Sequence, residues 1–186
     1  MRVPIVGVLT GKALERQAAG PATEDGAMDE FVSNYTNRLD AKGRVSIPAP
    51  FRAVLVRDGF DGLYCCPTLD RQAVDAGGNR LRNQIRESLA GFEAFSEDHE
   101  YLSTTLIGES EILKIDQDGR VVLSDAIKEH AGIAERAAFV GQGYKFQIWE
   151  PERFAAYREE AKNRVRNLRK SLGSSQRAAV SDGAEE

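Results

Sequence analysis

Eight short segments are predicted to be strands, at 34–39, 45–47, 62–66, 72–76, 111–115, 121–123, 136–141 and 144–150. In four of them, 34–39, 45–47, 111–115 and 121–123, hydrophobic and polar residues alternate, which is typical of strands with one buried face. Two longer stretches, 79–92 and 151–172, instead carry apolar residues at helical spacing and predict helices that each bury one face. The pattern as a whole predicts a protein that mixes strands and helices, the α+β class.

The most informative feature is an internal repeat. Residues 38–47 match residues 114–123 in the order base, apolar, Asp, two variable positions, Gly, Arg, apolar, one variable position, apolar, at a constant offset of 76 positions. Two copies are too few for a solenoid. The repeat therefore predicts two similar modules in one compact body, each running strand, turn, strand, helix, strand, strand, helix.

Within each copy, an Asp-x-x-Gly-Arg segment separates two predicted strands. Asp40 and Asp116 can accept hydrogen bonds from the backbone N–H groups ahead of them, and Gly43 and Gly119 tolerate a positive φ. We therefore expect each segment to be the turn of a β-hairpin that these four residues hold in shape.

A helix is expected after each hairpin. Pro50 suits the first turn of one helix, and Ser124 is a good N-cap for the other. Further along, Tyr144, Phe146 and Trp149 are expected to share one face of the last strand and to pack in the core or at a subunit interface.

Composition marks the ends of the folded region. The first residues mix Gly, Ala, Pro and Thr without periodicity, and Met28, where the regular pattern opens, is a candidate native start. The predicted divisions are a flexible N-terminal extension at 1–27, a first module at 28–95, a linker at 96–108, a second module at 109–172 and a disordered tail at 173–186.

The formal net charge of −4 does not by itself indicate a nucleic-acid binder. The charges are unevenly placed, however, with acids gathered at 93–100 and 182–186 and bases at 38–44 and 164–170. A local basic face is compatible with this distribution. The basic run at 164–170 is either a solvated helix end whose cations suit the helix dipole or a second set of phosphate contacts.

The sequence gives no support for several classes of protein. The apolar run Val3–Leu9 is much shorter than the roughly 18 residues of a membrane span, so no membrane association is expected and the cytoplasm is the expected location. Cys65 and Cys66 are adjacent and are expected to be small core residues. His99 and His130 have no nucleophile motif or metal cluster near them in the sequence, so we expect no enzyme, catalytic residue, metal, cofactor or small-molecule substrate.

Arg44 and Arg120 are the candidate DNA-reading residues. An exposed guanidinium at a hairpin end can bond guanine or phosphate bidentately, and a two-stranded ribbon fits the major groove. The alternative is that each arginine bonds the Asp of its own turn and only rigidifies the hairpin, and the two roles can coexist.

Three further cations, Lys42, Arg38 and Lys114, are best interpreted as phosphate contacts, which add affinity and salt dependence without specificity. Their alternative role is solvated surface charge.

Residues 35–48, followed by Phe51 and Arg52, resemble the signature of the MraZ family, bacterial DNA-binding regulators of the division and cell-wall gene cluster. The likeness runs from about residue 31 to about residue 172. It implies tandem swapped-hairpin modules, similar to the AbrB and MazE groups, whose strands interleave into a double-split β-barrel-like pseudo-dimer with flanking helices. It also implies ring-shaped homo-oligomers that bind short direct repeats in double-stranded promoter DNA, and hence association with the nucleoid.

The second copy departs from this pattern at its tip. Gln117 and Asp118 stand where the first copy has Ala41 and Lys42, so the second turn carries less positive charge. We therefore expect the two modules to differ in DNA affinity.

The leading hypothesis is a sequence-specific DNA-binding transcriptional regulator. The alternative is an antitoxin-like protein-interaction module with the same hairpin architecture, and a purely structural ring is the third reading. Antitoxins of this kind neutralise a toxin through a disordered C-terminal segment, and here the segment after Leu172 has almost no large apolar residues.

Overall fold

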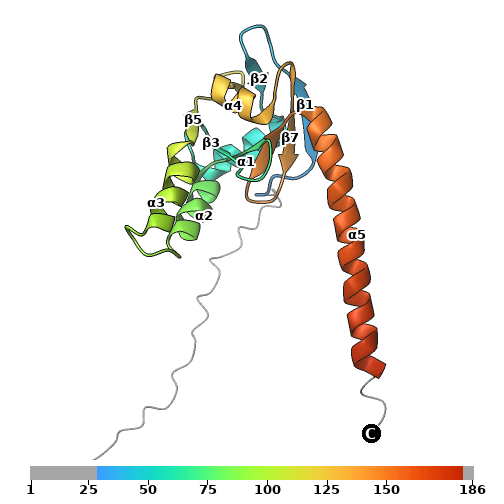
Figure 1. The fold of residues 1–186 in the computed structure, drawn as a ribbon. Coiled ribbons are helices and arrows are strands. Elements are labelled where there is room, and N and C mark those ends of the chain that lie inside the picture. Colours follow the sequence, from blue (N-terminus) through green and yellow to red (C-terminus); the bar gives the residue numbers. More distant parts are fainter. Residues whose placement is uncertain (1–28, 182–186) are drawn as a thin grey trace, which may run out of the picture.

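The strands form an open antiparallel sheet of six and a separate antiparallel pair, in a computed structural model that describes residues 29–181 (Figure 1). The order in the large sheet is β1-β7-β8-β4-β3-β5, and the small sheet pairs β2 with β6. The strands are β1 Asn34–Arg38, β2 Arg44–Ser46, β3 Leu63–Pro67, β4 Ala73–Gly77, β5 Glu111–Leu113, β6 Arg120–Val122, β7 Arg136–Gly141 and β8 Phe146–Trp149. The predicted α+β class is confirmed. The expected extension at 1–27 and Met28 lie outside the described residues.

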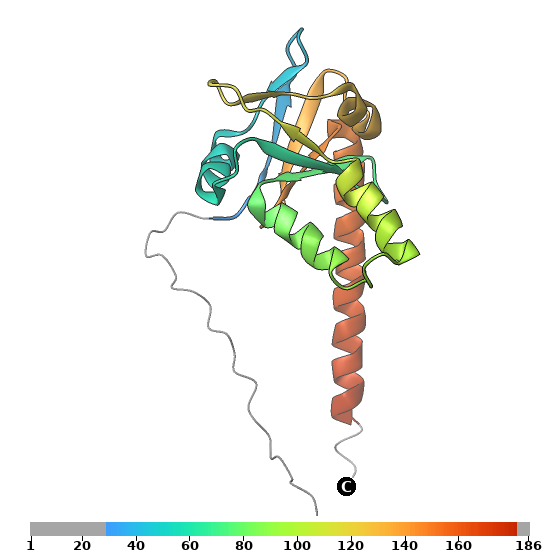
Figure 2. The same ribbon diagram turned by 90° about the vertical axis from the view of Figure 1, so that its left-hand side faces the viewer.

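Helices flank the sheets and project from the body (Figures 1 and 2). They are α1 Ala49–Asp58, α2 Asn79–Leu89, α3 Glu97–Ser103, the short π-helix η1 Thr104–Gly108, α4 Asp125–Ala131 and α5 Pro151–Ser181. Ser124 caps α4 by accepting a hydrogen bond from the backbone N–H of Ile127 (3.2 Å), as predicted. None of the helices in the described part of the chain combines the length and apolar composition that a membrane crossing needs.

The two halves of the chain exchange strands. β1 of the first half pairs with β7 of the second, β5 of the second half pairs with β3 of the first, and β2 pairs with β6. The hairpin prediction is therefore wrong in one respect, because the strands that each Asp-x-x-Gly-Arg turn connects do not pair with each other. A two-stranded hairpin with a three-residue arm is barely stable alone, and the exchange provides longer ladders and a shared core.

The expected barrel-like closure is not what the structure shows. β1 and β5 are the two edges of the six-stranded sheet, and they do not pair with each other. The physical reason is that the chain leaves the large sheet after each edge strand to build the separate β2–β6 ribbon.

One apolar cluster joins both sheets. Phe51 of α1 is 1% exposed and packs its ring against Phe31, Tyr35 and Phe146 at centroid distances of 5.3, 5.4 and 5.0 Å. Val45 and Val121 of the ribbon belong to the same cluster, with Leu39, Leu113 and the inward residues of β3, β4, β7 and β8. The ribbon is thus fastened to the large sheet through a common core.

The prediction that three aromatic residues share one face is wrong. Phe146 lies in the main core, whereas Trp149 packs on the opposite face with Tyr157 of α5 (4.9 Å between ring centroids). Tyr144 precedes β8 and is 39% exposed. Successive strand residues alternate between faces, so positions separated by three residues point in opposite directions.

Helices are more extensive than the sequence suggested. The segment 96–108, expected to be a linker, forms α3 and η1, and Ser96 caps α3 by accepting from the His99 N–H (3.2 Å). α5 continues past Leu172 through residues 173–181, which were expected to belong to a disordered tail. Those residues include Gln, Arg and Ala and contain no proline, which would end a helix.

Cys65 and Cys66 are confirmed as buried core residues of β3, and both are free thiols. Burial raises the pKa of each thiol, which keeps them protonated and unreactive at neutral pH.

Replacing Phe51 tests this shared core. Phe51→Ala is expected to lower the free energy of unfolding by about 3–5 kcal/mol, because it removes a ring that no solvent reaches and leaves a cavity. Urea unfolding followed by circular dichroism measures the loss. Val56→Ala on the same helix is the control, since Val56 is 79% exposed and its loss is expected to cost less than about 0.5 kcal/mol. Equal losses in the two variants would contradict this description of the core.

Candidate nucleic-acid interface

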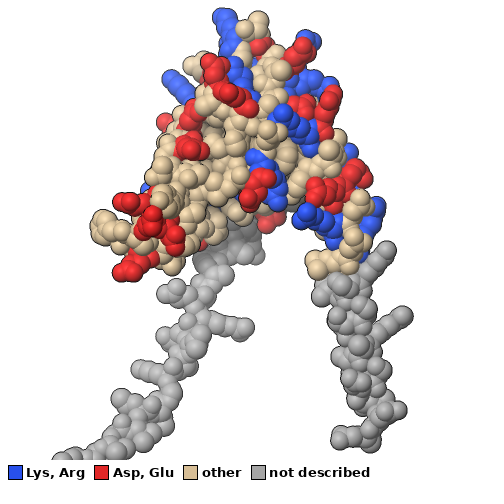
Figure 3. All heavy atoms as spheres, viewed as in Figure 1, with Lys and Arg blue, Asp and Glu red and all other residues tan. Residues whose placement is uncertain are grey.

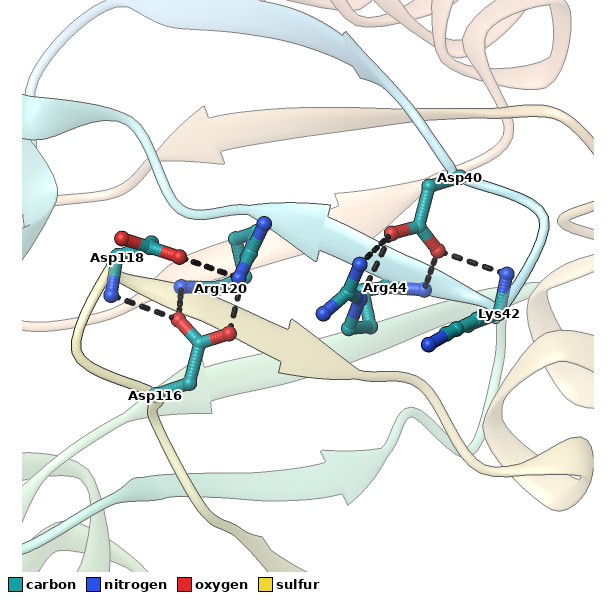
Figure 4. A network of polar contacts seen from close by, with 6 residues as sticks. All are labelled: Asp40, Lys42, Arg44, Asp116, Asp118 and Arg120. Atoms are coloured by element: carbon teal, nitrogen blue, oxygen red, sulfur yellow. Dashed lines mark hydrogen bonds and ion pairs between the residues drawn. The ribbon is translucent and has the colours of Figure 1, made fainter.

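The first turn is held by one carboxylate. Asp40 accepts hydrogen bonds from the backbone N–H of Lys42 (2.8 Å), the backbone N–H of Arg44 (3.0 Å) and the Arg44 Nε (2.7 Å) (Figure 4). The Asp40 N–H donates to the Arg44 carbonyl (2.9 Å), and Gly43 adopts a φ of +71°. Only glycine takes that φ without strain, which explains its place in the motif.

The second turn repeats this geometry. Asp116 accepts from the backbone N–H of Asp118 (3.0 Å), the backbone N–H of Arg120 (2.9 Å) and the Arg120 Nε (2.9 Å). Gly119 adopts a φ of +74°. One contact is additional, because the Arg120 Nη2 also pairs with the carboxylate of Asp118 (Figure 4).

The ribbon that joins the turns has one buried and one outward face. Its register pairs Arg44 with Val122, Val45 with Val121, and Ser46 with Arg120. The central valines are both 1% exposed, whereas Val122 is 54% exposed. Because opposite residues of a ladder share a face, both arginines lie on the outward face, one from each half of the chain (Figure 4).

The charges of the turns persist at neutral pH. The hydrogen bond from the Arg44 guanidinium, assisted by the Arg44 backbone N–H, lowers the pKa of Asp40 from 3.8 to about 2. The backbone N–H of Arg120 likewise lowers the pKa of Asp116, and the bond to Asp116 raises the pKa of Arg120. Each arginine is therefore a fixed cation with a defined orientation.

The two guanidinium groups are neutralised to different degrees. Arg44 uses its Nε and Nη2 on Asp40 alone, whereas Arg120 uses the same two nitrogens on Asp116 and Asp118. For either arginine, the Nη1 group has no partner among residues 29–181. Arg44 consequently presents more uncompensated positive charge, and its turn also carries Lys42.

The three predicted phosphate-contact residues are all exposed. Arg38 lies at the end of β1 and approaches Glu135 at 3.8 Å, with both side chains 77% exposed. Lys42 is on the first turn and Lys114 directly follows β5. Basic side chains project at the upper end of the molecule in Figure 3, where Figure 1 places the turn between β1 and β2.

Two cations were missed by the sequence analysis. Arg52 of α1 donates to the Ile47 carbonyl (2.9 Å) and lies against the second turn, since a Cβ built on Gly119 would be 2.3 Å from its Cδ. Lys128 of α4 lies beside the first turn, with its Nζ 3.9 Å from a Cβ built on Gly43. These two cations are also 76 positions apart, so the repeat offset could have indicated them. Each one lies close to the turn of the other half.

The described residues include few candidates for a metal-binding or catalytic site. Within residues 29–181, no group of three or more His, Cys, Asp and Glu side chains could hold a metal ion. His99 lies in the first turn of α3 and His130 in the last turn of α4.

Comparison with known proteins gives a consistent result. Residues 106–173 match the family model described as "MraZ protein, putative antitoxin-like". A protein of Beijerinckia indica named "Transcriptional regulator MraZ" is 60% identical over 147 residues, which cover 79% of this chain and 90% of the relative. A protein of the same name from Xanthobacter autotrophicus is 59% identical over 147 residues (79% and 94%). Another from Rhizobium meliloti is 38% identical over 135 residues (73% and 92%).

Titration of Asp40 tests the bracing of the first turn. Because its pKa is lowered by folding, its contribution to stability is complete above 3.8 and is lost as the pH falls from there through about 2. Carboxyl-carbon NMR is expected to give a midpoint near 2 in the parent protein. In Arg44→Lys, which lacks the guanidinium fork, the midpoint is expected to rise toward 3.8. A parent midpoint near 3.8, or no change in the variant, would contradict the arrangement.

Proposed function

The chain belongs to the MraZ family, and we propose that it is a transcriptional regulator that reads promoter DNA with the outward face of its β2–β6 ribbon. The observation that carries this proposal is the register of the ribbon, which brings Arg44 and Arg120 from the two halves onto one exposed face. A two-stranded ribbon is narrow enough to enter the major groove, where arginine is the commonest reader of guanine.

The aspartates assist the arginines in this role. A guanidinium has five N–H donors, and the bonds to Asp40 use only part of those of Arg44. The remaining edge is held in one orientation, so less side-chain freedom is lost when it bonds the O6 and N7 of a guanine. Asp40 is thus a positioning residue for Arg44, and Asp116 has the same role for Arg120.

Phosphate contacts surround the two reading residues. Lys42, Arg38 and Lys114 are exposed cations near the turns, while Lys128 of α4 lies beside the first turn and Arg52 of α1 lies against the second. Such contacts fix the position of a protein on the duplex without selecting sequence. The ribbon therefore supplies specificity, while the surrounding cations supply affinity.

Assembly explains how a protomer of net charge −4 could hold DNA. In the proposed arrangement residues 28–95 and 109–172 are swapped-hairpin modules, a reading that the exchanged strand pairing supports. A ring of such protomers would place successive ribbons on short direct repeats of a promoter at the nucleoid. Linking several weak contacts can raise affinity by about 10² to 10⁴ without any new contact.

An antitoxin-like interaction module is the second candidate, favoured by the wording of the family description. Its interaction would not depend on the two ribbon arginines, so the experiment below separates the two functions.

Replacing the arginines one at a time tests the reading face. Fluorescence anisotropy of the full chain with its own upstream promoter DNA is expected to show affinity lost by about tenfold to a hundredfold in Arg44→Ala, because a bidentate base contact disappears. Arg120→Ala is expected to lose less, since Asp118 already neutralises part of its charge.

The matched control is Arg86→Ala, an exposed arginine on α2, a helix that Figure 1 shows away from the turn between β1 and β2. It should leave the affinity unchanged, and a scrambled DNA should bind more weakly than the promoter in every case. Equal, weak binding of both DNAs that neither ribbon arginine affects would refute the proposal. Recovery of one stoichiometric protein partner in that case would favour the interaction module.

A further inference from the structure

An acidic protrusion lies away from the proposed DNA-reading end. Residues 91–109, which join α2 to α3 and continue through η1, contain five acids and no lysine or arginine. The acids are Glu93, Glu97, Asp98, Glu100 and Glu109. We call this segment the acidic knob, and Figure 3 shows the red side chains gathered at its end of the molecule. A surface of one sign is suited to a partner of the opposite sign.

The knob also holds aromatic rings in solvent. Phe95 is 94% exposed and has a φ of +68°, a backbone conformation that residues other than glycine rarely adopt. Tyr101 and Phe92 are 64% and 42% exposed. Such a backbone conformation costs free energy, and aromatic rings that become buried on association commonly dominate the energy of protein interfaces.

A groove lined by apolar and charged residues runs along α5. Tyr157, Ala161 and Val165 follow one another at spacings of four and therefore share a helix face. They line a hollow of about 470 Å³ together with Asp70, Arg71, Glu160 and Arg164. The Arg71 guanidinium lies 4.9 Å above the Tyr157 ring, so the groove has an apolar floor, and Arg71, Arg164, Asp70 and Glu160 surround it.

The helix beyond this groove is basic. Residues 161–169 include Lys162, Arg164, Arg166 and Arg169 and no acid, although Lys162 and Arg164 pair with Glu159 and Glu160 of the preceding turn. The knob and α5 lie on different sides of the molecule (Figures 1 and 2). The knob of one chain therefore cannot fill the groove of the same chain.

We propose that the acidic knob of one copy docks into the α5 groove of a second copy, with Phe95 on the apolar floor and the knob acids facing the cations of α5. The proposal rests on the homo-oligomer of the proposed function and specifies the surfaces that form it. Because the two surfaces differ, the contact is head-to-tail and leaves one knob and one groove open for further copies, which is the kind of contact that builds closed rings.

Phe95→Gly separates assembly from folding. Glycine accepts the positive φ, so the thermal midpoint of the variant is not expected to fall, while loss of the ring removes the anchor. Light scattering across a dilution series is expected to show the apparent dissociation constant of the assembly raised by about tenfold or more. Val56→Ala, which removes an exposed apolar group on α1, is the control and should assemble like the parent.

Mixing two variants tests the head-to-tail geometry. Val165→Glu places an acid in the groove and should impair assembly as Phe95→Gly does. An equimolar mixture of the two should form a dimer of one copy each, because one variant keeps its groove and the other keeps its knob. Parent-like assembly of either variant alone, or no dimer in the mixture, would overturn the proposal.

Measuring promoter binding with the same samples distinguishes failure of the knob-in-groove contact from failure of the proposed function. If the parent protein binds promoter DNA in an Arg44-dependent manner but Phe95→Gly assembles normally, the regulator survives and the knob-in-groove contact is refuted. If the parent protein is a monomer, both the proposed ring and this contact are refuted.

Discussion

The pairing of Val45 with Val121 at the centre of the β2–β6 ribbon is the contact on which the rest of the structure depends. Both valines are 1% exposed, and they are 76 positions apart, so the sequence repeat is paired with itself at this point. A three-residue strand is too short to form a stable hairpin alone, and here each valine is buried by the strand of the other half. The exchange that follows, of β1 onto β7 and of β5 onto β3, makes the two modules one folded unit.

A second contact between the two halves of the chain is made by polar side chains. β4 pairs with β8, and there Asp75 faces Gln147, whose amide donates to the carboxylate (2.8 Å) while Lys145 pairs with the same group. Gln147 is 2% exposed and also accepts from the Trp149 indole (3.0 Å). A buried network of this kind favours one register, because a shifted ladder would leave these polar groups without partners.

The alternation of inward and outward residues in the β2–β6 ribbon determines where the arginines lie. With the valines inward, the residues on either side of them must face outward, and those residues include Arg44 and Arg120. The same turn that reverses the chain supplies the carboxylate that orients each arginine. Net charge of the whole chain is therefore a poor guide to what this one surface can bind.

Much of the secondary structure and of the candidate site could be predicted from local sequence patterns. The Asp, Gly and Arg positions predicted both turns, and alternation located the strands, because each depends on residues close in sequence. Alternation reports which face of a strand is buried but not which strand lies beside it, so the exchanged pairing and the open sheet could not be predicted from it. Arg52 and Lys128 were not predicted as site residues, although they match at the repeat offset, because only the exchanged fold brings each one close to a turn of the other half.

The most direct test of a shared reading face is guanine methylation interference on the promoter. Methylation at N7 blocks the major-groove edge that an arginine would bond. If the ribbon enters one groove, the parent protein should be blocked at neighbouring guanines, and Arg44→Ala and Arg120→Ala should each become insensitive at a different, adjacent subset. An interference pattern that is identical in the parent and in both variants would contradict the account.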